Sequence, residues 1–219
     1  FKKAITDAEL KSPSGHYMPP ELASETMGTI DPASIDAFLD AAEALEQKWV
    51  IIPWMNEAWR NKEGYDHLIE YLIQLGEAAA QRGMVAGWHN HDFEFSEKLE
   101  GELLYDIMLN STDPKLVTQQ LDIGNMINGG GIPGEILKKW PGRFVSMHVK
   151  DEIVSKAGED KYESTILGKG IINVLEMVKL GDSLGGTKHF IIEQEAYQGI
   201  APIDCVKQDL QIMKKWGYK

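Results

Sequence analysis

Residues 84–94 read Met-Val-Ala-Gly-Trp-His-Asn-His-Asp-Phe-Glu. A short apolar run typical of a buried β-strand therefore passes directly into histidine, asparagine and carboxylate side chains. The same order recurs at three further apolar runs, 116–121, 144–147 and 189–192, which are followed by Asp122, His148 and Glu193. Because α/β enzymes build their sites at the carboxyl ends of parallel strands, this recurrence is the observation from which we interpret the fold.

Segments with helical periodicity lie between these strands. Asp31-Pro32 predicts a helix start, because aspartate caps helices and proline suits the first helical position. Further helices are predicted at 65–81, 173–180 and 203–213, and residues 1–10 are helix-like. Strands are also predicted at 49–53 and, more weakly, at 14–18 and 164–167. The alternation predicts an α/β fold with parallel strands and crossover helices.

Two architectures fit this alternation, an open doubly wound sheet and a (β/α)8 barrel. No strand is followed by a dinucleotide-binding glycine fingerprint, and Gly129-Gly-Gly131 lacks the spacing and lysine of a phosphate loop. If the four polar strand-end residues point inward, so do the residues one pleat below them, Gly87, Gln120, Ser146 and Ile191. Three of these four are small or polar, which favours the inside of a barrel.

Composition limits the classes of partner. The chain has 219 residues with 22 basic and 34 acidic side chains, a formal net charge of −12. Such a charge repels phosphate backbones, so we expect no nucleic-acid partner, and the lack of a long apolar segment predicts no membrane partner. The single cysteine, Cys205, excludes an internal disulfide and fits a reducing compartment such as the cytoplasm. The oligomeric state stays open, including a homo-oligomer.

The amino terminus suggests an incomplete chain. The sequence starts with Phe1 and opens directly into a helix-like stretch. We therefore expect an amino-terminal piece to be missing, and a signal peptide would lie in that piece. Localisation is accordingly unknown from the sequence, with the cytoplasm weakly favoured.

The four strand-end residues His89, Asp122, His148 and Glu193 offer a mixed set of nitrogen and oxygen donors. Each alone has an ordinary explanation: a hydrogen-bonded structural histidine, a turn at Asp122-Ile-Gly-Asn125, or a glutamate paired with lysine. Together, each at the end of its strand, they predict one site for a divalent ion. Such donors suit Mn, Co, Zn or Fe, and suit Mg less well.

Several motifs together resemble the sugar phosphate isomerase/epimerase family of the xylose isomerase-like TIM-barrel superfamily. They are Trp88-His-Asn-His-Asp-Phe-Glu-Phe95, Leu121-Asp-Ile-Gly-Asn125, Met147-His-Val-Lys-Asp151, Gly168-Lys-Gly170 and Ile192-Glu-Gln194. The resemblance extends from about His16 to the carboxyl terminus. It implies a single (β/α)8 barrel domain over 1–219 that lacks its first βα unit. It also implies one divalent ion, with manganese favoured, held by His89, Asp122, His148 and Glu193.

The implied function is a metal-dependent sugar isomerase or epimerase that acts through an enediolate on a keto-sugar or aldose. One departure matters, because ketose 3-epimerases of this superfamily have glutamate where this chain has His89. The chain keeps Glu193 alone of the two proton-transfer bases, which raises the alternative of a lyase or dehydratase acting on a keto-sugar or keto-inositol. A carbohydrate-binding protein on a decayed barrel and an AP endonuclease are less favoured, the latter because of the negative charge.

Each candidate residue has a predicted role in this chemistry. Glu193 is the predicted base, Lys150 a proton donor or oxyanion partner, and His91 a proton carrier. The predicted substrate-contacting residues are His16, Trp54, Glu94, Asn125 and Glu195. The sequence contains no phosphate cradle, and its acidic balance favours a small neutral sugar as the substrate.

Overall fold

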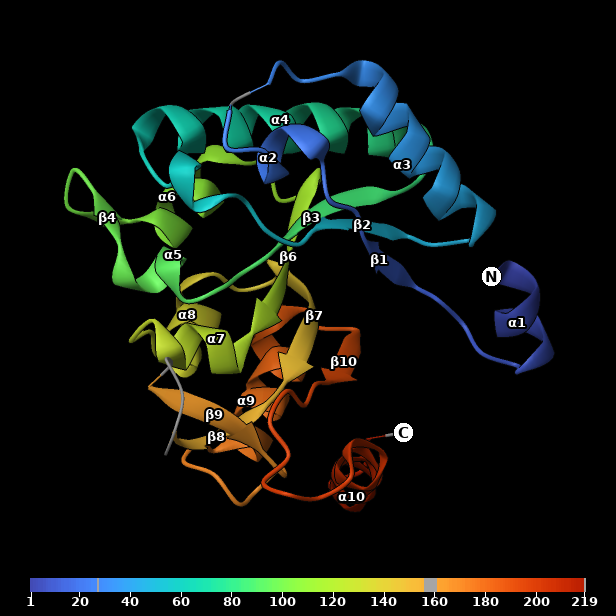
Figure 1. Cartoon of the computed structure of the whole chain (residues 1–219), viewed down its shortest axis with the longest axis vertical. Helices are drawn as coiled ribbons and strands as arrows, with labels where there is room; N and C mark the ends of the chain where they lie inside the picture. Colours follow the sequence, from blue (N-terminus) through green and yellow to red (C-terminus); the bar gives the residue numbers. More distant parts are fainter. Residues whose placement is uncertain (27, 156–160, 219) are drawn as a thin grey trace. The chain divides into compact units, whose positions relative to one another are not determined.

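The computed structural model describes residues 1–26, 28–155 and 161–218 (Figure 1). Their contacts divide the chain into two compact units. The first unit comprises residues 1–89 and 97–119, and the second comprises residues 90–96 and the chain from 120 onward. The strand β6 (Val117–Asp122) passes from the first unit into the second.

The sheet of the first unit is parallel. It contains β1 (Ser14–His16), β2 (Trp49–Ile52) and β3 (Val85–His89), with β2 in the middle. Val50 lies opposite both Gly15 and Ala86. The amino-terminal half of β6 comes next in strand order, and the amide of Ala86 donates a hydrogen bond to the carbonyl of Leu116. The predicted strands at 14–18, 49–53 and 84–88 are thus confirmed.

The helices of the first unit begin where local capping chemistry places them. They are α1 (Lys2–Asp7), α2 (Pro20–Ala23), α3 (Pro32–Ala44), η1 (Glu57–Trp59), α4 (Lys62–Gln81) and α6 (Leu104–Ser111). Asp31 caps α3 as predicted, because its side chain accepts from the amide of Ala33. Helix α4 starts three residues before the predicted Tyr65, because Asn61 caps it by accepting from the amide of Gly64.

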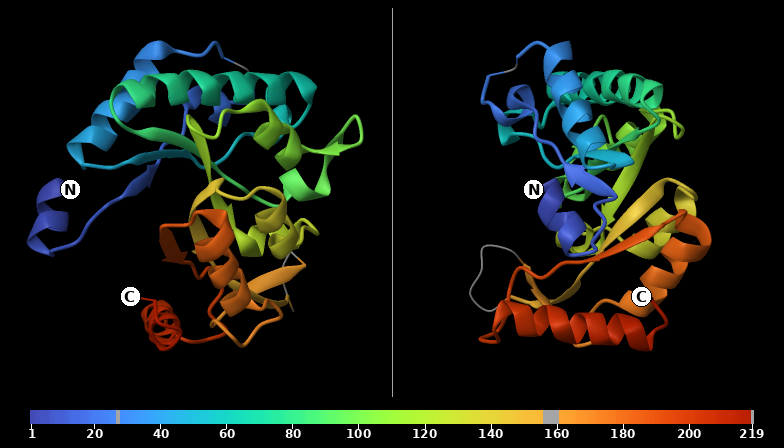
Figure 2. Two further views of the ribbon diagram at one scale, coloured as in Figure 1. Left: turned by 180° about the vertical axis from the view of Figure 1, so that it is seen from behind. Right: turned by 90° about the vertical axis from the view of Figure 1, so that its right-hand side faces the viewer.

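Helices α3 and α4 contact each other and the sheet of this unit. Figures 1 and 2 show them side by side, next to β2 and β3. Their buried faces carry Leu39 and Ala42 on α3 and Leu68 and Leu72 on α4, which are fully shielded from solvent. A two-stranded antiparallel hairpin, β4 (Lys98–Leu99) with β5 (Glu102–Leu103), completes the unit. The periodic apolar stripes therefore form core, as expected for amphipathic helices.

The second unit also contains parallel strands linked by helices. Strand β7 (Phe144–Val149) pairs in parallel with β10 (His189–Ile192), and the carboxyl-terminal half of β6 lies on the other side of β7 in strand order. Its helical elements are α5 (Phe93–Ser96), α7 (Ile123–Asn128), α8 (Pro133–Lys139), α9 (Val174–Leu180), η2 (Gly181–Gly185) and α10 (Pro202–Lys215). Gln120 donates to Oγ of Ser146 over 3.2 Å, so these two side chains lie on the same face of the sheet, as the pleat predicted.

One weak strand prediction is corrected. Residues 164–167 were expected to add a strand to the alternation, but the strand here is β9 (Tyr162–Thr165), which pairs antiparallel with β8 (Asp151–Val154). The two form a separate hairpin after β7. The residues after Thr165 turn back toward Asp151, whose carboxylate accepts from the amides of Gly168 and Gly170.

The described residues confirm the predicted α/β class, with parallel strands joined by helices. The six strands in the order β1, β2, β3, β6, β7, β10 are two fewer than a (β/α)8 barrel contains. Within the described part of the chain, no helix has the length and apolar character needed to cross a membrane. The assignment of residues 1–219 to a single domain stays a prediction.

Candidate active site

Three predicted ligands stand at the carboxyl ends of the strands of the second unit. Asp122 is the last residue of β6, His148 is the penultimate residue of β7, and Glu193 directly follows β10. Asp122 also caps α7, because its Oδ1 accepts from the amide of Asn125 over 2.8 Å. The Asp122-Ile-Gly-Asn125 segment is therefore a helix start, and the cap holds the carboxylate through Oδ1.

The donor atoms of these residues converge. Nδ1 of His148 lies 2.9 Å from Oε2 of Glu193 and 3.7 Å from Oδ2 of Asp122. Two donors that each lie ~2.0–2.2 Å from one ion are separated by about 3–3.5 Å, so this spacing fits a divalent ion. Oδ2 of Asp122 is fully buried, and besides His148 it faces Nζ of Lys150 in an ion pair at 3.2 Å, so its environment already favours a positive charge. Asp122, His148 and Glu193 therefore form a candidate metal-ligand group.

Lys150 lies at the centre of the same cluster. Its Nζ is 3.2 Å from Oδ2 of Asp122, 2.9 Å from Oε2 of Glu193 and 2.6 Å from Oε2 of Glu195. The side chain is 1% exposed, which is rare for lysine without charged partners. Burial acts to lower the pKa of Lys150, but the three carboxylates outweigh it and raise that pKa above its usual range. Lys150 is thus a buried ammonium ion, not a surface residue.

The two acidic ligands differ in how easily they ionise. Burial raises the pKa of Asp122 to about 6, although the charges of Lys150 and His148 oppose the rise. Burial also acts to raise the pKa of Glu193, but the hydrogen bond and charge of His148, with the charge of Lys150, lower that pKa well below its usual range. Both carboxyl groups are thus mainly ionised at neutral pH in the metal-free protein, but Asp122 takes up a proton at a higher pH than Glu193 does.

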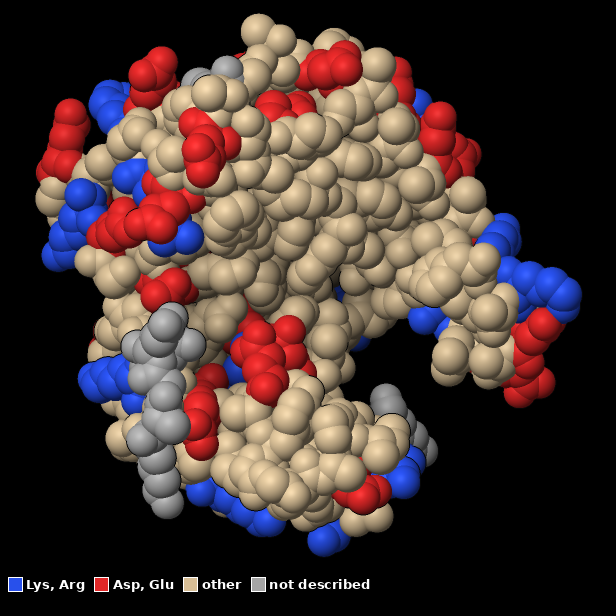
Figure 3. All heavy atoms as spheres, viewed as in Figure 1, with Lys and Arg blue, Asp and Glu red and all other residues tan. Residues whose placement is uncertain are grey.

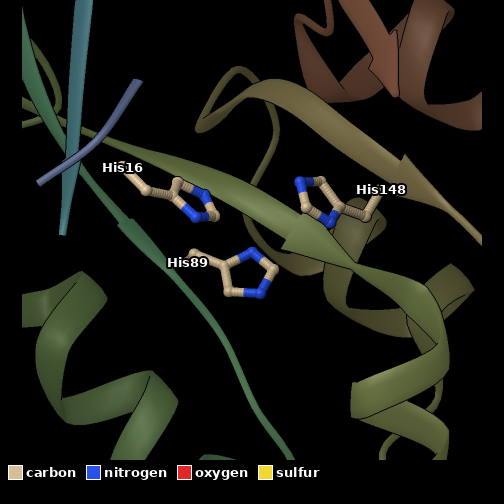
Figure 4. Close-up of side chains that lie close together, drawn as sticks. All are labelled: His16, His89 and His148. Carbon is tan, nitrogen blue, oxygen red and sulfur yellow. The ribbon is translucent and has the colours of Figure 1, made fainter. Parts of the chain in front are cut away.

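The first unit carries two of the predicted site histidines. His16 is the last residue of β1 and His89 the last residue of β3, and their ring centroids lie 5.2 Å apart with the rings tilted by 47° (Figure 4). His89 is buried, whereas His16 is exposed. His148, also drawn in Figure 4, belongs to β7 of the second unit. Trp54 follows β2 and is half-buried.

Three other predicted residues surround the cluster of the second unit. Oδ1 of Asn125 lies 3.4 Å from Nζ of Lys150, and Nδ2 of Asn125 donates to the carbonyl of Asn90. Glu94 is completely buried, and its Oε2 accepts from the amide of His91 over 2.9 Å. Glu94 therefore fixes the backbone at His91, whose ring stacks on Phe93 with centroids 6.0 Å apart. The roles predicted for these residues stay predictions.

A cavity of about 400 Å³ opens within the second unit. Its described lining includes His91, Asn125 and Glu195, and it reaches the hairpin β8–β9 through Glu152 and Glu163. Figure 3 shows acidic side chains gathered near this hairpin. Asn125 and Glu195, both predicted to contact substrate, line this cavity and also lie next to Nζ of Lys150.

Sequence reasoning missed three residues of this region. Asn90 joins the loop after β3 to β6, because it donates to the carbonyl of Asp122 and accepts from the amide of that residue. Glu152 is a buried carboxyl group of β8, 2% exposed. Asp151 is fully buried and accepts backbone amides. Asn90 and Asp151 stand inside motifs quoted from the sequence and Glu152 directly follows one, but no role was predicted for any of the three, because their contacts come from distant parts of the chain.

Asp151 explains the Gly168-Lys-Gly170 motif. Its carboxylate accepts from four backbone amides, those of Glu152, Gly168, Gly170 and Ile172, at 2.8–3.1 Å. A side chain at Gly170 would overlap this carboxylate. The motif is therefore a backbone cradle for Asp151, which fixes the segment after β9 to the start of β8.

Asp151→Asn is expected to destabilise the protein by about 2–4 kcal/mol. The amide that replaces one carboxylate oxygen would face backbone N–H groups, so buried donors would lose their acceptor. The free energy of unfolding in urea, compared between wild type and variant, measures this. Exposed Asp182→Asn serves as the control and should change the stability by less than about 0.5 kcal/mol. A stability equal to that of wild type in Asp151→Asn would contradict the structural role.

Comparisons with known proteins agree with this architecture. A family model described as xylose isomerase-like TIM barrel matches residues 1–216. The chain is 28% identical over 155 residues to an inosose dehydratase of Geobacillus thermodenitrificans and 29% identical over 171 residues to one of Clostridium botulinum. These alignments cover 64% and 71% of this chain and 50% and 55% of the relatives. The chain thus spans about half the length of the curated relatives it matches.

Solved structures show the same fold. Two crystal structures of sugar phosphate isomerase/epimerases from Parabacteroides distasonis superpose with TM-scores of 0.77 and 0.79 at 24% and 23% identity. They cover 97% and 98% of this chain, which covers 73% and 80% of theirs. A D-tagatose 3-epimerase-like protein superposes with a TM-score of 0.68 at 22% identity, over 98% of this chain and 80% of that structure. The predicted fold class is confirmed, and the chain belongs to the xylose isomerase-like TIM barrel family.

Proposed function

We propose that this protein is a divalent-metal-dependent enzyme that removes the proton next to the carbonyl group of a sugar, as a sugar isomerase or epimerase does. The observation that carries the proposal is the convergence of Oδ2 of Asp122, Nδ1 of His148 and Oε2 of Glu193 around Nζ of Lys150. This cluster combines candidate metal ligands, an ionised carboxylate and a buried ammonium ion. Such a set suits abstraction of a proton and charge stabilisation on the neighbouring oxygen.

A bound divalent ion, with manganese favoured, would supply Lewis-acid stabilisation of the carbonyl oxygen and the neighbouring hydroxyl oxygen. Asp122, His148 and Glu193 would hold it. His89 is proposed as the fourth ligand because it ends β3 as the other ligands end their strands. Asp122 is fully buried and capped onto α7, so it would serve as a fixed ligand with no further role in proton transfer.

Glu193 is the proposed base. Its side chain is 29% exposed, whereas that of Asp122 is fully buried, so a substrate can reach Glu193. It is ionised at neutral pH, as a base must be, although the charges of His148 and Lys150 that lower its pKa also weaken it as a base until they shift toward substrate. Its contacts with His148 and Lys150 use Oε2, and we assign the proton-accepting role to Oε1. Nζ of Lys150 would then donate a hydrogen bond to the oxygen that gains charge.

The remaining predicted residues complete the proposed site. His91, His16 and Lys150 are the candidates to move a proton on the second face of the substrate. His16, Trp54, Asn125 and Glu195 are proposed to contact the sugar, and Glu94 is proposed to act by holding the backbone of His91. If nothing serves the second face, isomerisation or elimination would be favoured over inversion.

A dehydratase acting on a keto-sugar or keto-inositol is the second candidate. The curated relatives described above are named inosose dehydratases, which favours it. The resemblance of the sequence motifs adds that His89 stands where ketose 3-epimerases have a second base. The same proton abstraction by Glu193 would then expel a hydroxyl group on the next carbon. Lys150 is placed to protonate or hold an oxygen in either reaction.

Metal analysis followed by NMR of candidate ketoses and keto-inositols in deuterated water tests both candidates. Solvent deuterium in recovered or isomerised sugar supports the isomerase or epimerase reaction, whereas loss of water from the carbon skeleton supports the dehydratase. A metal-loaded protein that neither exchanges protons nor eliminates water with any of these compounds would contradict the proposal.

Asp122→Asn is expected to weaken binding of the divalent ion at least about 100-fold. Loss of a residue that only hydrogen-bonds a metal ligand already costs about 10–100-fold in affinity, and loss of the charge of a ligand itself should cost more. Asparagine keeps Oδ1, which caps α7, so the fold should survive. Titration of the metal by calorimetry measures the change, and circular dichroism checks the fold. His89→Gln tests the fourth ligand in the same way, and Asp182→Asn is the surface control. Metal affinity unchanged in Asp122→Asn would count against the site.

A further inference from the structure

The cavity of the second unit contains a buried acid group whose hydrogen-bonding capacity is incompletely used. Glu152 lines this cavity and is 2% exposed, and its Oε2 accepts no hydrogen bond from the described residues. The backbone around it is fixed, because its amide donates to Oδ1 of Asp151 and its carbonyl accepts from the amide of Ile171. A side chain at position 124 would overlap Oε1 of Glu152, so Gly124 leaves room for this carboxyl group.

Glu152 is therefore held in one place with an oxygen available to a ligand. Burial raises the pKa of Glu152 to about 8, and the charges of Asp122, Glu195 and Asp151 raise it further while Lys150 opposes them. A protonated carboxyl group presents one donor and one acceptor, which is the pattern that a hydroxyl group complements. An unpartnered buried group of this kind favours a ligand that satisfies it.

The other cavity walls also suit hydroxyl groups and disfavour anions. Asp92, Glu163 and Glu195 supply carboxylates, and no lysine or arginine lines the cavity among the residues described. The wall at Glu195 is rigid, because Oγ of Ser164 accepts from the amides of Glu195 and Ala196, both over 2.8 Å. A phosphate group placed here would meet these carboxylates, and within the described lining no lysine or arginine offsets their repulsion.

The geometry points to this cavity as a binding pocket for the uncharged, polyhydroxylated part of a sugar or cyclitol, with Glu152 as a specificity-determining hydrogen-bonding group and with phosphorylated sugars excluded. The inference rests on the proposed function for the identity of this ligand as the substrate. Glu195 and Asn125 support that connection, since both line the cavity and both lie within 3.4 Å of Nζ of Lys150. The bound polyol would thus extend from the cavity toward Lys150 and Glu193.

The test uses an unreactive pair of probes, D-glucitol and D-glucitol 6-phosphate, with the manganese-loaded full chain in a calorimeter. Neither probe has a carbonyl group, so binding is measured without turnover. We expect D-glucitol to bind at millimolar concentrations and its phosphate to bind at least tenfold more weakly. No binding of D-glucitol, or equal or tighter binding of the phosphate, would overturn the inference.

Variants then assign the effect to the cavity. Glu152→Ala should weaken D-glucitol binding about fivefold to tenfold, as loss of one buried hydrogen-bonding group predicts, whereas Glu152→Gln should stay within about threefold of wild type. Glu135→Ala, an exposed change on α8, is the matched control. Unchanged binding in folded Glu152→Ala would refute the role of this residue.

Charge reversal provides a second arm that does not depend on Glu152. Glu163→Lys should reduce the preference for D-glucitol over its phosphate at least about fivefold, because it places a cation on the cavity wall. An unchanged preference in this variant would also overturn the inference. Binding of D-glucitol without deuterium exchange of any ketose would leave the pocket intact and contradict the proposed reaction, so the two failures are distinguishable.

Discussion

Glu193→Gln is expected to lower the rate of proton exchange at the carbon next to the substrate carbonyl by about 10²–10⁴-fold, the range that a positioned base contributes. Glutamine keeps the shape and one oxygen of Glu193 but cannot accept a proton at neutral pH. The rate is followed by NMR as incorporation of solvent deuterium into the sugar. Because Glu193 is also a proposed ligand, the comparison must be made at saturating divalent ion for both proteins.

Glu195→Gln is the matched control for this prediction. Glu195 contacts the same ammonium ion of Lys150, but its side chain is 65% exposed and it belongs to no candidate ligand group among the described residues. Its replacement should weaken substrate binding and leave most of the exchange rate at saturating substrate. Exchange at the wild-type rate in Glu193→Gln, with Glu195→Gln impaired instead, would reverse the two assignments and make Glu195 the base.

The environments of Glu193 and Asp122 give the physical reason for choosing between them. Both carboxylates lie near His148 and Lys150, but Asp122 lacks solvent and its pKa rises to about 6. Glu193 keeps partial solvent exposure, and its cationic neighbours lower its pKa. One carboxylate is therefore suited to a fixed ligand position, and the other to contact with substrate. Environment, not residue type, separates the roles.

The sequence predicted the strands because they depend on local patterns, and the candidate ligands were named from the same patterns and stay predictions. The β-rich apolar runs at β2, β3, β6, β7 and β10 were recognised, and the polar residues at the ends of β3, β6, β7 and β10 followed from the same observation. Helix α4 was placed correctly apart from its start, because capping by Asn61 adds a turn without apolar periodicity.

The hairpin β8–β9 and the buried environment of Lys150 could not be predicted from local sequence patterns. Strand β8 begins with Asp151 and Glu152, and acidic residues are uncommon in buried strands unless tertiary contacts compensate them. That compensation comes from amides 17 to 21 residues away, at Gly168, Gly170 and Ile172. The burial of Lys150 likewise requires carboxylates from β6 and from the segment after β10. No local pattern contains this information.

The second large effect is expected for Lys150→Met, because Lys150 is the cation that balances the carboxylates around it. In the metal-free protein, this change removes the ammonium ion that faces Asp122, Glu193 and Glu195. Methionine fits the space of the lysine stem, but it leaves buried carboxylates without their cation. Loss of one partner from a buried ion pair costs about 3–5 kcal/mol, so we expect the free energy of unfolding to fall by this amount. Urea denaturation of protein treated with a chelator measures the change.

A divalent ion should reverse much of this loss. With Lys150 replaced, the proposed ligands carry one more uncompensated negative charge, so manganese should bind the variant at least as tightly as wild type and should raise its melting temperature by a larger increment. Lys138→Met, which removes an exposed lysine from α8, controls for the change in net charge and should leave both quantities near those of wild type. A Lys150→Met protein that is destabilised but gains no more than wild type from the ion would show that Lys150 and the ion do not compensate the same carboxylates.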